Sequence, residues 1–193
     1  MRSRRGLSFS RRRRNMSAFI MKEIFSWLLH ILVAVFMAFI LVFCIGMRTS
    51  VIGVSMEKTL YSGQQVLVNR LSYLFFRPEE GDIVVFTPNG NRNTHFYIKR
   101  VVAVPGDEVC IRDGRLYVND TIVDYGYDKI MDAGIAEDVV TLDSDEYFVM
   151  GDNCNNSEDS RSGNIGPVSR DMIEGKAWFV FGNGVSFSGF ISK

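Results

Sequence analysis

The stretch "EVCIRDGRLYVNDTIV" at residues 108–123 carries the clearest fold signal in this chain. Asp113-Gly114 separates two runs in which apolar and polar residues alternate, as they do along half-buried strands. This pair suits a two-residue hairpin turn, because glycine accepts a positive φ without strain. A second turn is expected at Asn119-Asp120. The stretch therefore predicts consecutive antiparallel strands.

Further segments share this character, since they are short, rich in β-branched and aromatic residues, and bounded by Gly, Pro, Asn or Asp. They are 64–71, 81–88, 96–104, 146–152 and 175–181. We predict a mostly β fold, with a single folded sheet system or a barrel-like arrangement.

Two regions differ from this pattern. "SRDMIEG" at 169–175 favours a helical turn with Ser169 as its cap. Region 124–145 is acidic and weakly periodic, and we predict that it leaves the main sheet as a small inserted lobe.

A long apolar segment, "IFSWLLHILVAVFMAFILVFCIG", occupies residues 24–46. At about 1.5 Å per residue it reaches roughly 34 Å as a helix, enough to cross a hydrocarbon core of about 30 Å. The alternative is a cleaved signal peptide, whose apolar region is normally about 7–15 residues long and is followed by an A-x-A-like site. The run is longer than that, and "GMRTSVIG" after it offers no such site. We predict a retained transmembrane signal-anchor helix.

The formal net charge of zero over 193 residues conceals a strong asymmetry. Residues 1–22 contain eight basic and no acidic residues, whereas residues 49–193 contain 13 basic and 21 acidic ones. Basic flanks stay in the cytoplasm. We therefore predict a cytoplasmic N-terminus at 1–23 and an extracytoplasmic β-rich domain at 47–193 of a single-pass cell-membrane protein. A nucleic-acid-binding arm is the rival interpretation, but the position beside the span favours topology, so no nucleic-acid partner is expected.

The cysteines and histidines give little support for a metal site. Cys44 lies in the predicted span, whereas Cys110 and Cys154 share a compartment that permits a disulfide. Spacing does not establish that bond, and free thiols are the favoured interpretation. Past the span His95 is the only histidine, and no C-x-x-C pair occurs. We predict no metal and no cofactor.

Ser55 and Lys58 form a literal S-x-x-K, the signature of penicillin-binding proteins and class A β-lactamases. That chemistry needs both residues on one helical face. Tyr61-Ser62-Gly63 is a turn signal, however, and Gln64–Val68 alternates as a strand does. The required K-T-G motif is also missing, and the outer domain is too short for that class. We expect the partner of Ser55 elsewhere.

Lys99 lies in a more suitable environment. In "HFYIKRVVAVPGD" at 95–107, strand alternation puts Tyr97, Lys99, Val101 and Ala103 on one face. Burial disfavours the ammonium form and lowers the pKa, which allows a lysine to act as a general base near neutral pH. The alternative is an edge-strand lysine whose amine reaches solvent, and the residues alone leave both open.

Several separated segments together resemble the membrane-anchored type I signal peptidases. They are "SMEKTLYSG" (55–63), beside the family's S-M-x-P-T-L; "RPEEGDIVVF" (77–86); "YIKRVVAVPGD" (97–107); and "GDNCNNSEDSR" (151–161), beside G-D-N-x-x-x-S-x-D-S-R. Order, spacing and the preceding span agree, and the resemblance covers residues 24 to 181.

This resemblance implies a Ser-Lys protease that removes signal peptides from exported pre-proteins after small residues, with a signal-peptidase/LexA-like β-rich catalytic domain. Ser55 would be the nucleophile and Lys99 the general base. Ser157 would orient the lysine amine. Asp159 and Arg161 match a supporting pair, and the resemblance suggests Asp152 for the same outer layer.

The resemblance also implies how substrate is held. The backbone N–H of Ser55 is the expected oxyanion donor, while Gly53 stands where some members have a serine hydroxyl. Small apolar pockets would bind an extended substrate. Their expected lining is Val51, Gly53, Met56, Leu60, Tyr97 and Ile98. The expected partners are signal peptides of secretory pre-proteins, the lipid bilayer and the secretion translocon.

Three positions depart from the family pattern. Lys58 replaces a proline, Gln64 an aspartate and Cys154 an arginine. Because proline fixes φ and lysine does not, Lys58 is expected to loosen the turn after Ser55. Two other functions stay open at this point: a self-cleaving LexA-type Ser-Lys protease, and an inactive membrane-anchored β-domain that binds a partner.

Overall fold

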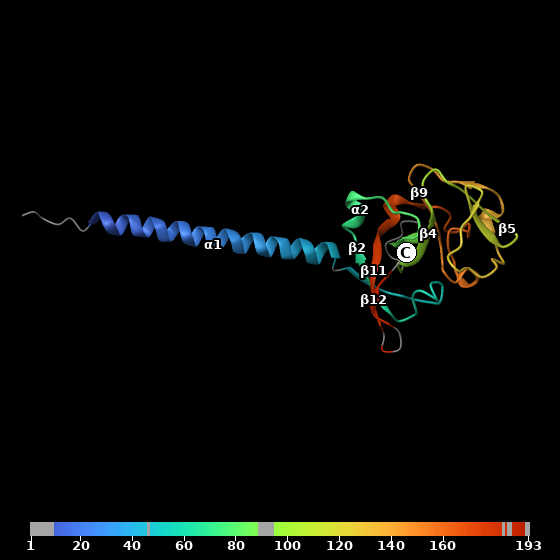
Figure 1. The fold of residues 1–193 in the computed structure, drawn as a ribbon, viewed down its shortest axis with the longest axis horizontal. Helices are drawn as coiled ribbons and strands as arrows, with labels where there is room; N and C mark the ends of the chain where they lie inside the picture. The colour runs from blue at the N-terminus through green and yellow to red at the C-terminus, as the bar shows by residue number, and fades with distance from the viewer. Residues whose placement is uncertain (1–9, 46, 89–94, 183, 185–186, 192–193) are drawn as a thin grey trace, which may run out of the picture. The chain divides into compact units, whose positions relative to one another are not determined.

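The computed structural model describes residues 10–45, 47–88, 95–182, 184 and 187–191 (Figure 1). The chain divides into two compact units, Met1–Phe43 and Cys44–Lys193. The described part of the first unit is helical, and the second unit is built mainly from strands. The mostly β prediction with one N-terminal helix is therefore confirmed.

Helix α1 runs from Ser10 to Ile45. Within it Phe19–Ile40 is long and apolar enough to cross a membrane, judged by length and composition. The apolar stretch thus begins before residue 24, because Phe19, Ile20 and Met21 continue it. Arg2, Arg4 and Arg5 lie outside the described residues. The boundaries between cytoplasmic, membrane and outer parts stay predictions.

The second unit contains two antiparallel sheets within its described residues. One has eight strands, in the order β1-β2-β11-β3-β4-β9-β10 with β12 paired to β11, and the other has the order β7-β6-β5-β8. The strands are β1 (Met47–Ser50), β2 (Gln65–Asn69), β3 (Ile83–Phe86), β4 (Tyr97–Ala103), β5 (Glu108–Arg112), β6 (Arg115–Val118), β7 (Thr121–Ile122), β8 (Val140–Thr141), β9 (Glu146–Met150), β10 (Val168–Ser169), β11 (Ile173–Phe181) and β12 (Gly189–Phe190).

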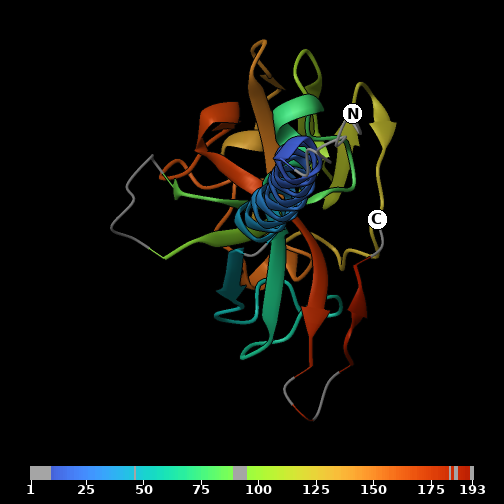
Figure 2. The same cartoon turned by 90° about the vertical axis from the view of Figure 1, so that its left-hand side faces the viewer.

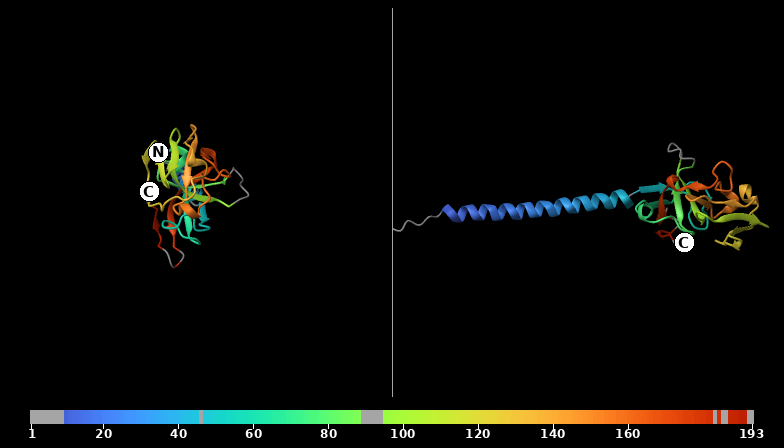
Figure 3. Two further views of the ribbon diagram at one scale, coloured as in Figure 1. Left: turned by 90° about the vertical axis from the view of Figure 1, so that its right-hand side faces the viewer. Right: turned by 90° about the horizontal axis from the view of Figure 1, so that it is seen from above.

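The two sheets occupy different parts of this unit. Figures 1 and 3 both show β5 and its neighbours at the end of the unit away from β2, and Figure 2 shows β2 beside β11. The expectation of one folded sheet system is thus replaced by two sheets. Region 124–145 belongs with the smaller one, since β8 pairs with β5.

The two predicted hairpin turns are confirmed. Asp113 and Gly114 have φ of 54° and 75°, and Asn119 and Asp120 have φ of 49° and 58°. Positive φ at both central residues is the turn geometry whose twist matches that of paired strands. The register agrees, because Arg112 pairs with Arg115 and Val118 with Thr121.

Three local expectations need correction. Residues 170–172 form a short 3-10 turn, η4 (Arg170–Met172), but the Ser169 side chain makes no capping hydrogen bond. A short helix, α2 (Ser72–Phe75), forms where none was expected. Ala103 does not share a face with Val101, because a bulge opposite β9 inserts one residue between them.

Three clusters of buried residues form the core of the second unit. One fills the space between the smaller sheet and β4 and β9, and it contains Phe148, Met150, Val102, Val109 and Leu116. A second packs the β1–β2 loop onto β2, β3 and β11, and a third lies around Tyr147 and Phe86. Further short 3-10 turns, η2 (Gly134–Glu137) and η3 (Cys154–Asn156), border the first cluster.

We expect Phe148→Ala to lower the free energy of unfolding by about 3–5 kcal/mol, the usual cost of emptying a buried phenylalanine site. Phe148 is fully buried. Met131→Ala is the control, because Met131 is 86% exposed and its truncation should cost no more than about 0.5 kcal/mol. Denaturant unfolding of the full chain in detergent measures both. Equal losses would show that Phe148 is not a core residue.

Candidate active site

Ser55 lies on a tight turn in the loop between β1 and β2. The Leu60 N–H and the Thr59 N–H both donate to the Met56 carbonyl, and Val51 N–H donates to Gln64 O at the base of the loop. No helix forms at Ser55, so Lys58 is not carried to the same face as the serine. The S-x-x-K interpretation is therefore excluded by the backbone.

Lys99 lies in the middle of β4 and reaches Ser55. Its Nζ is 2.7 Å from Ser55 Oγ, which is hydrogen-bond distance. Lys99 is only 4% exposed, and the ring of Tyr97 lies 5.6 Å from the amine. Burial lowers the pKa of Lys99 from 10.5 to about 8, although the Asp159 and Glu158 carboxylates act in the opposite direction. The buried-lysine hypothesis is confirmed over the solvent-exposed one.

Ser157 approaches this pair but does not make the expected contact. Its Oγ is buried and has no hydrogen-bond partner among the described residues. The hydroxyl instead lies against the backbone of Gly151, where an added Cβ would be 2.3 Å from it. The predicted hydrogen bond to the Lys99 amine is thus not formed in this structure.

Asp159 and Arg161 form a buried, two-pronged ion pair. Arg161 Nε donates to Asp159 Oδ1 at 2.8 Å and Nη2 donates to Oδ2 at 2.9 Å. Asp159 Oδ2 also accepts from Gly151 N–H, and Arg161 donates to the carbonyls of Asp132 and Cys154. The pair therefore joins the 151–161 loop to itself and to the region around Asp132.

Asp152 pairs with Arg100, which the sequence analysis did not single out. Arg100 Nε and Nη2 donate to the two carboxylate oxygens of Asp152 at 2.8 Å each, and both side chains are buried. Thr59 Oγ1 donates to the same carboxylate. Arg100 follows Lys99 directly, so one strand supplies the amine on one face and this anchor on the other. Two consecutive cationic residues inside an otherwise apolar strand, "YIKRVV", were the signal that could have revealed this ion pair.

Asn153 and Gly151 hold the serine turn directly. Asn153 N–H donates to Ser55 O at 3.0 Å, and its side-chain amide donates to Val54 O at 3.2 Å. A Cβ at Gly151 would lie 2.5 Å from Ser55 O, so only glycine permits this approach. Within the described part of the chain, the Ser55 N–H donates a hydrogen bond to no acceptor.

A cavity of about 270 Å³ lies beside the Ser55–Lys99 pair. Four of the expected pocket residues line it: Val51, Met56, Tyr97 and Ile98. Ile52, His95 and Phe96 line it too, and the sequence analysis missed them. Leu60 is fully buried in the core, and neither it nor Gly53 is among the lining residues. Gly53 has φ of 84°, a conformation that strains a side-chain-bearing residue.

Comparison with known proteins agrees with this geometry. The family described as signal peptidase, peptidase S26, matches residues 24–182. The chain belongs to this signal peptidase family. A probable signal peptidase I-2 from Synechocystis is 37% identical over 72% of this chain and 67% of its own length. Signal peptidase IB from Staphylococcus aureus is 34% identical over 83% of this chain and 90% of its own.

Among solved structures, a signal peptidase I from Enterococcus faecalis is similar, with 29% identity and a TM-score of 0.43. It covers 52% of this chain and 97% of its own. A likeness at this score supports no conclusion, and the assignment to the family follows from the sequence comparisons.

At each of the three positions that depart from the signal peptidase pattern, the side chain makes a polar contact. Gln64 is fully buried, and its Oε1 accepts from Tyr61 N–H at 2.7 Å. Cys154 and Cys110 are free, buried thiols, as the favoured interpretation predicted. Lys58 does not hang loose, because its Nζ donates to Gly126 O and to Asp128. These contacts tie the Lys58 side chain to residues 126–128, and the effect of Lys58 on the rigidity of the turn stays a prediction.

We expect Gly151→Ala to lower kcat of this signal peptidase by at least about 10²-fold, the size of loss that follows displacement of a reacting group by about 1 Å. The new Cβ would lie 2.5 Å from Ser55 O and 2.7 Å from Ser157 Cβ, and neither atom can move away by rotation of a side chain. Gly163→Ala is the matched control, because its Cβ meets nothing within 4 Å. Turnover of a pre-protein by the two variants tests this, and equal activity would contradict it.

Proposed function

We propose that this chain is a serine endopeptidase that removes N-terminal signal peptides from exported pre-proteins, cleaving after small residues. The observation that carries the proposal is the 2.7 Å approach of Lys99 Nζ to Ser55 Oγ in a buried environment. A serine hydroxyl is a weak nucleophile until a base accepts its proton, and a neutral amine at this distance can do so.

The reaction follows the order of acyl transfer. Neutral Lys99 takes the Ser55 proton as Oγ attacks the scissile carbonyl, and the Ser55 N–H stabilises the oxyanion that forms. The resulting ammonium then protonates the leaving amine, and the acyl-enzyme is hydrolysed by water with Lys99 again as base. The Asp159–Arg161 and Asp152–Arg100 pairs do not react and hold the surrounding loop and strand in place.

The cavity beside the pair provides a place for a substrate side chain next to the reacting atoms. Its volume is about 270 Å³ and its lining includes Val51, Met56 and Ile98, whereas the preference for small residues is carried over from the signal peptidase family. The pocket residues Met56 and Val51 are nearly inaccessible, so they form its floor rather than its rim. An extended signal peptide would bring small residues into this space, as A-x-A-like sites require.

A place in the cell membrane, with the N-terminus in the cytoplasm and the second unit outside, is part of the proposal. Its support is the apolar stretch Phe19–Ile40 and the arginines before it. Leu74, Phe75 and Phe76, in and after α2, are each more than 70% exposed. Met47, in the first strand of the second unit, pairs with Val68, which precedes α2 in the chain. A lipid surface is therefore the expected contact, with the secretion translocon nearby.

Ser55→Ala and Lys99→Met should each lower kcat by at least about 10⁴-fold, as removal of a nucleophile or its base does in serine proteases. Arg115→Met is the control, since Arg115 is an exposed cation on β6 of the smaller sheet. Purified full-length protein in detergent is assayed on a pre-protein with an A-x-A site. Retained activity in Lys99→Met would refute the mechanism, and cleavage of its own chain alone would favour the LexA-type alternative.

The value of kcat/KM should rise with pH to a half-maximum near pH 8. Only neutral Lys99 can accept the proton, and its fraction grows as the pH rises through a pKa of about 8. A lysine with an ordinary pKa near 10.5 would give a profile still rising at pH 10. Initial rates measured across this pH range separate the two cases. At each extreme, a return to neutral pH checks that any loss of activity is reversible.

A further inference from the structure

Two departures from the signal peptidase pattern meet at one residue, Asp128. Lys58 Nζ donates to Asp128 Oδ2 at 3.3 Å and to Gly126 O at 2.9 Å. On the other side, Cys154 Sγ donates to the backbone carbonyl of Asp128 at 3.6 Å. Lys58 and Cys154 are far apart in sequence, yet both replaced positions contact the same short segment.

The backbone conformation of Lys58 indicates that its contact with Gly126 and Asp128 is a defined feature of this turn. Lys58 has φ of 86°, a conformation that is unfavourable for a residue with a side chain and persists only where the surroundings hold it. Proline, the usual residue of the family pattern here, fixes φ near −65° and cannot adopt it. The turn of this chain therefore follows a path that the pattern residue could not take.

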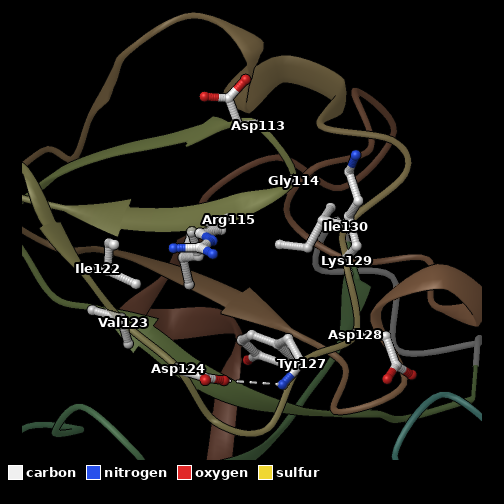
Figure 4. Close-up of a pocket in the computed structure, with 11 residues that line it drawn as sticks. Asp113, Gly114, Arg115, Ile122, Val123, Asp124, Tyr127, Asp128, Lys129 and Ile130 are labelled. Atoms are coloured by element: carbon white, nitrogen blue, oxygen red, sulfur yellow. Dashed lines mark hydrogen bonds between the residues drawn. The ribbon is translucent and has the colours of Figure 1, made fainter.

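The segment that receives Lys58 is itself well anchored. Asp124 Oδ1 accepts from Gly126 N–H and Tyr127 N–H, and Ile130 N–H donates to Gly114 O. In Figure 4 this segment forms one wall of a cavity of about 640 Å³, with Lys129 and Ile130 near Gly114 and Asp128 farther along the wall.

The same segment also holds the loop that carries Asn153. Asn155 Nδ2 donates to Lys129 O at 3.0 Å, and Asn155 Oδ1 accepts from Met131 N–H at 3.0 Å. Asn153 in turn donates to Ser55 O. The serine turn and the 153–155 loop are thus fixed to one support, residues 126–131, as well as to each other.

We propose that Lys58 is a positioning residue of this signal peptidase, which fixes the Ser55 turn to Asp128 and supplies there the cation that the family pattern carries at position 154. This inference rests on the proposed function. Cys154 is the counterpart of Lys58 in this inference. Its small, buried thiol carries no positive charge, so Lys58 is the cation that pairs with Asp128. Burial raises the pKa of the Cys154 thiol, which keeps it protonated and neutral.

The test compares kcat and KM of full-length Lys58→Ala and Lys58→Arg on a pre-protein, with active sites titrated so that rates refer to folded enzyme. Lys58→Ala should lower kcat about 3- to 10-fold, the size expected for one exposed ion pair and one hydrogen bond, with KM nearly unchanged. Lys58→Arg should recover most of the loss. A purely structural role would lower the melting temperature and leave kcat per titrated site unchanged, which would overturn the proposal.

Arg112→Ala is the matched control. Arg112 and Asp120 form an ion pair on the smaller sheet, with side chains 51% and 80% exposed, against 52% and 75% for Lys58 and Asp128. Its loss should leave kcat unchanged, because that pair does not reach the serine turn. Equal effects of Arg112→Ala and Lys58→Ala on kcat would overturn the proposal.

A double-mutant cycle tests the link between the two departures. Lys58→Ala leaves Asp128 without its cation and keeps a residue that is not restricted to the φ of proline, Cys154→Arg places two cations against Asp128, and the double variant restores one. We expect the double variant to lose at least about 5-fold less activity than the product of the single losses, the size of coupling seen between residues that share a partner. A simple product would refute the link. If the wild type cleaves no pre-protein, the proposed function itself fails and this inference falls with it.

Discussion

The burial of one amine beside one hydroxyl is the constraint on which the rest of this structure depends. Removing Lys99 from water lowers its pKa from 10.5 to about 8, which corresponds to about 3 kcal/mol against the charged form. That cost is tolerated because the surrounding strands and loops are fixed by other interactions. The Asp152–Arg100 pair and the Asn153 contacts attach the 151–161 loop to β4 and to the serine turn, and the Asp159–Arg161 pair fixes that loop internally.

The two faces of β4 carry different interactions. Lys99 faces the cavity and the serine, whereas Arg100 turns to Asp152 and Thr59 on the other side. Any shift of the strand along its axis would disturb both contacts at once. A buried ion pair with good geometry adds little net stability, but it does select one arrangement over near alternatives. Here that selection keeps the amine within reach of the serine.

Much of this could be predicted from the sequence, and the failures have physical reasons. The hairpin turns followed from Asp-Gly and Asn-Asp, because turn chemistry is local. Strand alternation placed Lys99 on an apolar strand face but left its burial open, and the resemblance to signal peptidases supplied its partner. The bulge that moves Ala103 to another face, the second sheet and the Arg100 anchor depend on contacts between distant segments. The path of Lys58 also escaped prediction, because its partners lie 68 and 70 residues away.

Ser55 and Lys99 come from segments 44 residues apart, and their meeting has a consequence for the life of the chain. The Ser55–Lys99 pair cannot form until β2, β11 and β3, which separate β1 from β4 in the sheet, have paired with one another. The 151–161 loop must also pack against the serine turn. An incompletely folded chain therefore cannot bring the lysine amine to the serine hydroxyl.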